Sequence, residues 1–284
     1  MKGREFLAMA APSAVAMLTL MLAPMLMLVA ISFYNFHFGA PPTWIGWGNY
    51  TEAFASPRVW EATWWTLLYT AITVPLELGL GLGVALLLDR LRGGRGLAVA
   101  AMLLPFIITP VVGTVVYAWL FKDPWGFYVQ LLGVFGLSFD YSASAWGSRA
   151  LLMLYRVWSA TPFAILVFFA GLQSAPVDRL EAAAIDGAGA FNRFWHVILP
   201  HLRPLLLFVA MIAVMDNWRE FDSVFVMTHG GPGSSTATVM FLTYTVAFAE
   251  QALGRGAAYA CLTVVAIAVL LAPFVYLVWR EQRA

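Results

Sequence analysis

Long apolar stretches alternate with short polar ones along the whole chain. A helix needs about 20 apolar residues to cross the hydrocarbon core of a bilayer. Six stretches reach that length and predict transmembrane helices over residues 6–31, 63–88, 97–121, 149–172, 202–227 and 257–279. A seventh stretch, 238–249, is too short to span and has glycine-containing segments on both sides. We expect it to form a helix at the outer interface or partly inserted in the bilayer.

Composition supports this pattern. Of the 284 residues, 62% are hydrophobic and only 11% are charged, against roughly 25% charged residues in an ordinary soluble domain. The net charge of +1 creates no field that attracts polyanions, and a single cysteine excludes a disulfide framework. The sequence therefore predicts an all-α integral membrane protein and excludes a soluble enzyme, a disordered chain and a nucleic-acid binder.

The first apolar stretch follows Lys2 and Arg4, as in a signal peptide. Its apolar run is about 26 residues, whereas the apolar region of a signal peptide has about 7–15. We therefore expect it to be retained as the first transmembrane helix of a single domain over residues 1–284.

Basic residues in short loops predict the orientation, because they concentrate on the cytoplasmic side. With both termini inside, the inner segments hold most of them, namely Lys2, Arg4, Arg90, Arg92, Arg95, Arg179, Arg193, Arg203, Arg280 and Arg283. The outer side holds Arg58, Lys122, Arg149 and Arg255. We therefore predict cytoplasmic N- and C-termini in the inner or cytoplasmic membrane of a cell.

The longest inner segment, 173–203, has the pattern of two short helices. Pro176 suits a helix start, and Asp178 with Glu181 complements the positive end of that helix. Gly187 breaks the pattern, and a second amphipathic stretch over 190–199 is expected to end before Pro200. An amphipathic pattern alone is unspecific, and the alternative interpretation of this segment is a surface loop that rests on the bilayer.

The residue order in this segment resembles the EAA loop of ABC importer permeases. In that family the loop docks into a cleft of the cytoplasmic ATPase, its glycine turns the short coupling helix, and its glutamate pairs with a basic residue of the ATPase. The resemblance implies these coupling roles for Glu181, Ala182, Ala183, Asp186, Gly187, Ala188, Phe194 and Pro200.

The likeness extends along most of the chain and resembles the carbohydrate branch of these importers, in particular the first of their two permeases. It includes Trp47-Gly48-Asn49-Tyr50 and Gly230-Gly231-Pro232. The outer loop between the first two spans is too short for the large outer domain of the maltose importer's first permease. The resemblance implies as partners a second homologous permease, two ATP-binding-cassette subunits that bind ATP and Mg, and an extracytoplasmic solute-binding protein.

Ionisable side chains inside spans are costly and usually mark function. Asp216, Arg219, Glu220 and Ser223 share one stripe of a continuous helix, and Glu77 lies in the second span. Internal pairing, of Asp216 with Arg219 or of Arg156 with a carboxylate on a neighbouring helix, is one interpretation. The resemblance implies a substrate pathway along Arg156, Trp158, Ser159, Phe163, Asp216, Asn217 and Glu220.

Several motifs are absent or explained by packing. The sequence contains no G-x-x-x-x-G-K-[ST] phosphate loop, no G-x-S-x-G and no H-E-x-x-H. Gly79, Gly81 and Gly83 predict close helix packing, and His196 and His201 lack metal-ligand spacing, so we predict no catalytic or metal site and no cofactor in this chain. An ion-coupled secondary transporter is the alternative class, and a membrane-bound enzyme is more remote. The solute stays open among sugars, oligosaccharides, sugar alcohols, glycerol and glycerol phosphate.

Overall fold

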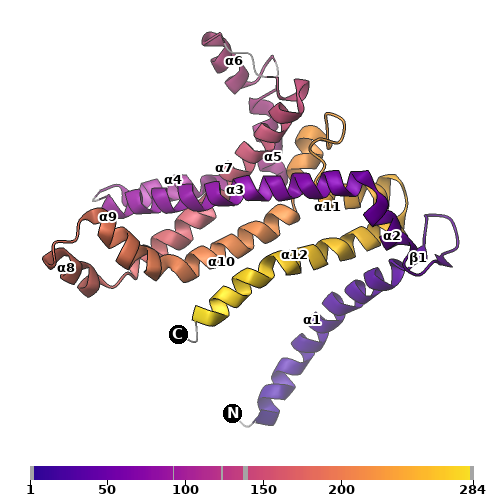
Figure 1. Cartoon of the computed structure of the whole chain (residues 1–284), viewed down its shortest axis with the longest axis horizontal. Helices are drawn as coiled ribbons and strands as arrows, with labels where there is room; N and C mark the ends of the chain where they lie inside the picture. The colour runs from indigo at the N-terminus through magenta and orange to yellow at the C-terminus, as the bar shows by residue number, and fades with distance from the viewer. Residues whose placement is uncertain (1–2, 92, 123, 137–139, 282–284) are drawn as a thin grey trace. The chain divides into compact units, whose positions relative to one another are not determined.

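A computed structural model describes residues 3–91, 93–122, 124–136 and 140–281 of the chain. Lys2, Arg92 and Arg283, which count toward the predicted orientation, lie outside the described residues. The long helices are α1 (Gly3–Ile31), α3 (Pro57–Arg90), α7 (Ala145–Gln173) and α12 (Leu253–Glu281) (Figure 1). The shorter helices are α2 (Gly48–Ala55), α4 (Arg95–Ile107), α5 (Pro110–Leu120), α6 (Phe127–Val134), α8 (Val177–Ile185), α9 (Ala190–Arg193), α10 (Leu199–Trp218) and α11 (Val239–Tyr244).

Five helical segments of the described residues are long and apolar enough to cross a membrane, namely Ala11–Ile31, Pro57–Arg90, Ala145–Gln173, Ala190–Trp218 and Leu253–Arg280. The pair α4 and α5 makes a sixth if it is counted as one span. The prediction of an all-α membrane protein is thus confirmed, and the six predicted spans are matched by five such segments, or by six with the α4–α5 pair. The short apolar stretch is also helical, over Val239–Ala249.

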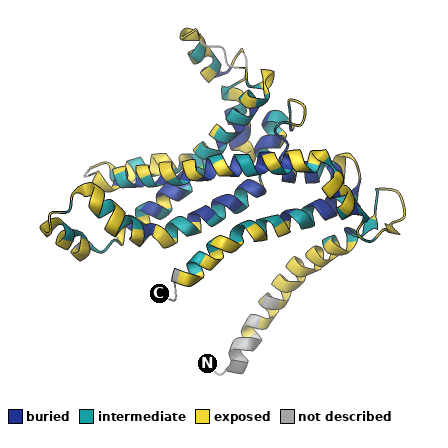
Figure 2. Ribbon diagram, viewed as in Figure 1, coloured by how far each residue is buried: buried dark blue, intermediate teal, exposed yellow. Residues whose placement is uncertain are grey.

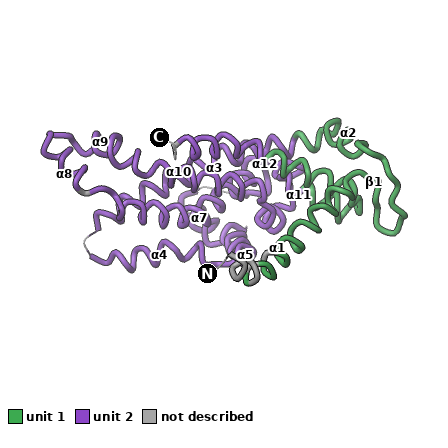
Figure 3. The backbone as a smooth tube through the Cα atoms, turned by 90° about the horizontal axis from the view of Figure 1, so that it is seen from below, with its two compact units in different colours: residues 1–60, 242–266 green, residues 61–241, 267–284 purple. Residues whose placement is uncertain are grey.

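The chain divides into two compact units (Figure 3). Unit 1 comprises residues 1–60 and 242–266, and unit 2 comprises residues 61–241 and 267–284. The grouping of all 284 residues into a single permease domain stays a prediction. Each unit is described by itself below.

Unit 1 joins segments that are far apart in the sequence. Strands β1 (Tyr34–Asn35) and β2 (Thr43–Trp44) pair antiparallel. The fully buried Asn49 donates from Nδ2 to the carbonyl oxygens of Ser32 at 2.7 Å and Tyr34 at 2.9 Å. Gly254 packs directly against the Tyr34 carbonyl, where a side chain would have no room. The asparagine of the G-x-N-Y motif therefore fixes the segment 32–34, which lies against the start of α12.

Unit 2 has a core built from α3, α7 and α10. One buried cluster contains Ala85, Ala164, Phe168, Leu172 and Leu202. A second buried cluster, toward the other end of α7, contains Trp65, Tyr69, Tyr117, Leu151, Leu152, Tyr155, Val224 and Met227. Figure 2 shows the buried residues of these helices as dark stripes beside exposed ones.

The predicted third span, 97–121, is wrong as a continuous helix. Helices α4 and α5 meet at a bend of 96°. The break lies at Ile108 and Thr109, whose ψ angles are 131° and 138°. A residue before proline avoids the helical conformation, and Thr109 precedes Pro110, which then starts α5.

The predicted fifth span, 202–227, is also interrupted. Helix α10 ends at Trp218, and helical structure resumes in a π-helical turn over Val224–Thr228. Between them Glu220 accepts hydrogen bonds at Oε1 from the backbone N–H and the hydroxyl of Ser223, at 3.1 and 2.7 Å. These bonds satisfy donor groups at the start of the second helical piece. The Glu220 side chain thus takes the place of the backbone acceptor that the continuous helix predicted from the apolar pattern would provide.

Candidate functional site

A cavity of about 550 Å³ lies within unit 2, between the α4–α5 bend, α7 and the end of α10. Arg156, Ser159 and Phe163 reach it from α7, Asp216 reaches it from the end of α10, and Glu220 reaches it from the break after α10. Further lining residues are Glu77, Pro105, Phe106, Ile108, Pro110, Thr114, Tyr155, Arg219, Phe221 and Asp222. The structure thus brings five of the seven predicted pathway residues together.

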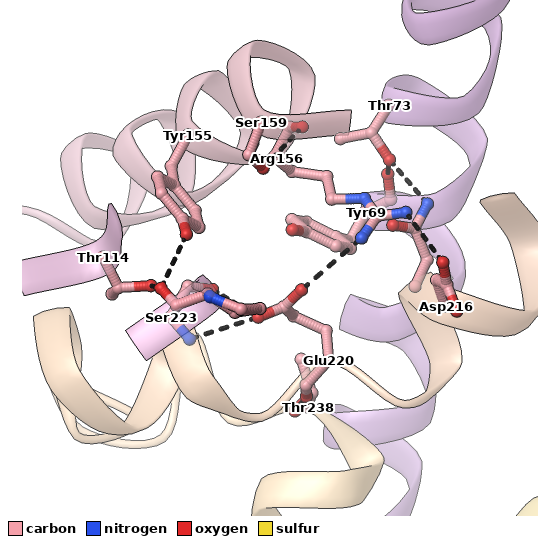
Figure 4. A network of polar contacts seen from close by, with 12 residues as sticks. Tyr69, Thr73, Thr114, Tyr155, Arg156, Ser159, Asp216, Glu220, Ser223 and Thr238 are labelled. Atoms are coloured by element: carbon pink, nitrogen blue, oxygen red, sulfur yellow. Dashed lines mark hydrogen bonds and ion pairs between the residues drawn. The ribbon is translucent and has the colours of Figure 1, made fainter. Parts of the chain in front are cut away.

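Arg156 lies at the centre of the charged side chains in this cavity (Figure 4). Its Nε donates to Glu77 Oε1 at 2.9 Å. Its two terminal nitrogens each lie 3.9 Å from a carboxylate oxygen, one of Asp216 and one of Glu220. The Arg156 side chain is only 13% exposed and that of Glu77 only 3%. A buried ion pair requires such partners, because an unpaired charge in a low-dielectric interior is costly.

This geometry confirms internal pairing of Arg156 with a carboxylate on a neighbouring helix. The other interpretation paired the side chains of Asp216 and Arg219. The contact in the structure is between their backbones, because the N–H of Arg219 donates to the Asp216 carbonyl at 3.1 Å, and the Arg219 side chain is exposed. The predicted stripe of Asp216, Arg219, Glu220 and Ser223 assumed an unbroken helix and is wrong as a helical face. The residues still converge, because the break after Trp218 keeps Asp216 and Glu220 beside Arg156.

Two predicted pathway residues do not line the cavity. Trp158 packs its ring against Tyr117 and Tyr155, with ring centroids 5.6 and 6.1 Å apart. Asn217 is fully buried and donates from Nδ2 to Thr73 Oγ1 at 2.8 Å. A contact between α10 and α3 therefore engages the NH2 group of the amide that the resemblance assigns to solute.

Aromatic rings form another part of the cavity wall. Phe106 of α4 and Phe163 of α7 stack at a centroid distance of 5.8 Å and an interplanar angle of 25°. Sequence reasoning missed Phe106, because a continuous third span gives no reason to single it out. The Thr109-Pro110 step was the signal that could have found the bend.

The segment 173–203 forms the second candidate site, at one end of unit 2 (Figures 1 and 3). Helix α8 ends at Ile185 with Asp186 as its C-cap, and Gly187 follows with φ of +79°. The N–H of Gly187 donates to the Ala184 carbonyl at 3.1 Å, and that of Ala188 donates to the Ala183 carbonyl at 2.9 Å. This is the Schellman arrangement, in which glycine supplies the left-handed residue that closes the helix.

The surface of α8 is largely uncovered. Glu181, Ala182 and Asp186 are exposed, and the apolar Ile185 is 86% exposed. Phe194 is half-buried, whereas the neighbouring Phe191 is 73% exposed. A small apolar and acidic surface of this kind is available to a partner.

The predicted end of the second short helix before Pro200 is wrong. Helix α9 passes through a π-helical turn, Phe194–Ile198, into α10 without a break. Pro200 has no N–H for the carbonyl one turn earlier, and the N–H of Leu199 instead reaches back to the Phe194 carbonyl. The wider turn accommodates the proline and joins the loop rigidly to α10.

The two ends of this loop are tied together at its base. His201 Nε2 lies 3.3 Å from Ser174 Oγ and 3.2 Å from the Gly171 carbonyl oxygen. Gly171 faces Leu202 and Leu205 so closely that a side chain there would overlap them. The end of α7 and the start of α10 are therefore held together where the loop begins and ends.

Comparison with known proteins identifies the family. The family model described as "Binding-protein-dependent transport system inner membrane component" matches residues 77–282. The chain belongs to this family. The permease is a multi-pass inner-membrane subunit of an ABC importer, a transport component and not an enzyme.

Curated relatives support this assignment. The permease is 36% identical over 245 residues to a probable ABC transporter permease of Sinorhizobium fredii, covering 86% of this chain and 78% of that protein. It is 31% identical over 224 residues to the trehalose/maltose transport system permease protein MalF of Thermococcus litoralis, covering 78% and 76%. It is 33% identical over 256 residues to the sulfoquinovosyl glycerol transport system permease protein SmoG of Agrobacterium fabrum, covering 88% and 82%.

The fold also matches a solved importer. A chain of a bacterial alginate ABC transporter, in complex with an alginate pentasaccharide-bound periplasmic protein, superposes with a TM-score of 0.86. The match covers 99% of this chain and 97% of that chain at 18% identity. The permease therefore has the fold of an importer transmembrane subunit.

Proposed function

We propose that this permease carries a carbohydrate or related polyhydroxyl solute through the unit 2 cavity. The observation that carries the proposal is the cavity itself, in which charged side chains around Arg156 face the stacked rings of Phe106 and Phe163. Carboxylates accept hydrogen bonds from hydroxyl groups, and aromatic rings offer an apolar surface to the face of a sugar. A volume near 550 Å³ lies in the usual range for small-ligand sites.

The identity of the relatives supports the same substrate class. Relatives named for trehalose/maltose, sulfoquinovosyl glycerol and sn-glycerol-3-phosphate all align over at least three quarters of this chain. The solutes in these names all carry several hydroxyl groups, but they differ in net charge. The proposal therefore stops at the polyhydroxyl class.

The assembly we propose contains a second permease, two ATPase subunits and an external solute-binding protein. ATP and Mg are bound by the ATPases, since this sequence lacks a phosphate loop. Helix α1 presents mostly exposed apolar side chains, such as Leu20 at 76% and Leu26 at 67% (Figure 2). Lipid and the second permease would cover such surface. In this arrangement both termini and the 173–203 loop face the cytoplasm.

Coupling in this proposal runs through α8. Glu181 and the exposed Ile185 dock on an ATPase, and Gly187 sets the turn that presents them. Closure of the ATPase dimer moves α8, and the tied base at Gly171 and His201 passes that motion to α7 and α10. Both helices carry cavity residues, so the pathway changes its accessibility with the ATPase state.

Uptake in cells that lack the chromosomal copy of this permease tests the proposal. We expect deletion to abolish accumulation of at least one radiolabelled sugar or polyol, and the reintroduced chain to restore it. Depletion of ATP should stop that accumulation, whereas an ionophore that collapses ion gradients at constant ATP should not. Loss of accumulation with the ionophore alone would favour an ion-coupled transporter, and unaltered uptake of every polyhydroxyl solute would contradict the proposal.

A further inference from the structure

We infer that the unit 2 cavity selects uncharged polyhydroxyl solutes and rejects anions of the same size and stereochemistry. This inference rests on the proposed function and refines it, because the family includes permeases named for neutral and for anionic solutes. Three observations support it: the occupied guanidinium of Arg156, the excess of carboxyl groups, and the accessible oxygens of Asp216.

Arg156 is the buried cation of the cavity, and its side chain is already surrounded by carboxylates. A guanidinium binds an incoming carboxylate or phosphate by presenting two N–H groups side by side. Here Nε is bound to Glu77, and the two terminal nitrogens face Asp216 and Glu220. An anionic solute that approaches the terminal nitrogens therefore meets Asp216 and Glu220 at that edge, and like charge opposes its binding to Arg156.

The ionisable groups that line the cavity also disfavour an anion, because acidic groups outnumber basic ones. Four carboxyl groups, Glu77, Asp216, Glu220 and Asp222, accompany two guanidinium groups, Arg156 and Arg219. With any one carboxyl protonated, the carboxylates still outnumber the arginines. Arg219 is exposed and lines the same cavity as Asp216 and Asp222, so an anion approaching it also meets like charge. Such repulsion grows in a site of low dielectric constant.

Hydroxyl groups find suitable partners in the same cavity. The Asp216 side chain is 43% exposed, so its oxygens can accept from a solute hydroxyl while one of them lies 3.9 Å from Arg156. The hydroxyl of Ser159 donates to the Arg156 carbonyl at 3.2 Å and keeps its lone pairs for a donor. A neutral sugar thus exchanges water for carboxylate and hydroxyl acceptors, whereas an anion gives up water in a cavity where carboxylates outnumber guanidinium groups.

Equilibrium binding to the assembled importer in lipid nanodiscs, without the solute-binding protein, tests the inference. The probes are methyl glucoside with methyl glucuronide, and methyl galactoside with methyl galacturonide. Each pair differs by one carboxylate on the same ring. Saturation-transfer NMR detects the weak binding expected of a transport pathway.

The wild-type importer should bind each methyl glycoside at least tenfold more tightly than its uronide. Asp216→Asn combined with Asp222→Asn should reduce that preference at least threefold. The matched control is Asp140→Asn, in a loop outside the cavity. Hydrogen bonds from Ser142 lower the pKa of Asp140, so this control removes one full negative charge at neutral pH and should leave the preference unchanged.

Uronide binding as tight as glycoside binding in the wild type would overturn the inference, and so would an unchanged preference in the Asp216→Asn, Asp222→Asn variant. Each single variant is measured beside it, so that a folding defect of the double variant cannot hide the result. If the importer accumulates only anionic sugars, the charge inference fails and the proposed function stands. If it accumulates no polyhydroxyl solute of either charge, the proposed function itself fails.

Discussion

At the scale of single residues, unit 2 contains a buried ion pair between α7 and α3. Arg156 and Glu77 are 13% and 3% exposed and 2.9 Å apart. Removing one member of a buried pair leaves an uncompensated charge, which costs about 3–5 kcal/mol, whereas replacing both by apolar residues of similar volume is often nearly neutral. The pair therefore affects stability as well as the solute pathway.

We expect Arg156→Met to lower the free energy of unfolding by about 3 kcal/mol, because it strands Glu77 without a counter-ion. Arg156→Met combined with Glu77→Leu should recover most of that loss. Unfolding of the purified protein in mild detergent, followed by circular dichroism, measures both changes. Equal stability of the wild type and the single variant would refute a structural role for the pair.

The aromatic residues of α7 provide a second comparison at this scale. Phe163→Ala should weaken solute binding by about 0.5–1.5 kcal/mol, the range for aromatic ring contacts, because Phe163 lines the cavity. Trp158→Ala is the matched control, since Trp158 packs against Tyr117 and Tyr155. Binding titrations with the accumulated solute should separate the two variants. A larger loss for Trp158→Ala would place the pathway elsewhere on α7.

At the scale of elements, the three glycines of α3 behave differently. A side chain on Gly81 would overlap Ala164 of α7, whereas Gly79 and Gly83 have open space. The motif thus marks one close approach of two helices, not three. Sequence spacing alone does not distinguish these positions, because that depends on how α7 crosses α3.

Gly81→Leu should destabilise the permease by about 1–3 kcal/mol through overpacking. Gly79→Leu and Gly83→Leu are matched controls in the same helix and should leave stability nearly unchanged. The amount of folded protein recovered from membranes, with its melting temperature in detergent, gives the comparison. A neutral Gly81→Leu would mean that α3 and α7 do not approach closely.

The α8 turn can be tested in the same way. Gly187→Val forces a β-branched residue to φ of +79°, whereas Gly189 has φ of −64°, which valine adopts readily. We expect Gly187→Val to insert normally and to reduce ATP-driven uptake at least about tenfold, the effect of 1.4 kcal/mol, within the usual 1–3 kcal/mol of backbone strain. Gly189→Val should retain uptake. Normal uptake in both variants would contradict the docking role of this turn.

Sequence patterning predicts elements whose apolar runs are continuous and misses the interruptions inside them. Helices α3, α7 and α12 overlap their predicted spans closely. The bend at Thr109 had a visible signal in Pro110. The break after Trp218 has neither proline nor glycine and depends on the Glu220–Ser223 hydrogen bonds. The spacing of apolar residues does not predict such hydrogen bonds. The same breaks bring Phe106 and Glu220 to the cavity, so the site was predictable only in part.

At the scale of the whole molecule, the proposed transport depends on partner subunits. Mostly exposed apolar side chains on α1 and an uncovered Ile185 on α8 leave surface that lipid and other subunits would cover. The resemblance of the 173–203 loop to the coupling loop of importers identified the family, because that motif combines a fixed residue order with a glycine turn. Composition and hydropathy alone reach only the membrane class.

Affinity purification of the tagged permease from its own membranes in mild detergent, with every co-purifying subunit identified, shows whether the permease works within an ATP-driven importer. We expect to recover a phosphate-loop ATPase and a second, related permease with it in fixed stoichiometry. Glu181→Lys should reduce the recovered ATPase, and Asp178→Lys, a matched change on the same exposed helix, should reduce it less. Recovery of this chain alone, with uptake that survives ATP depletion, would contradict the account.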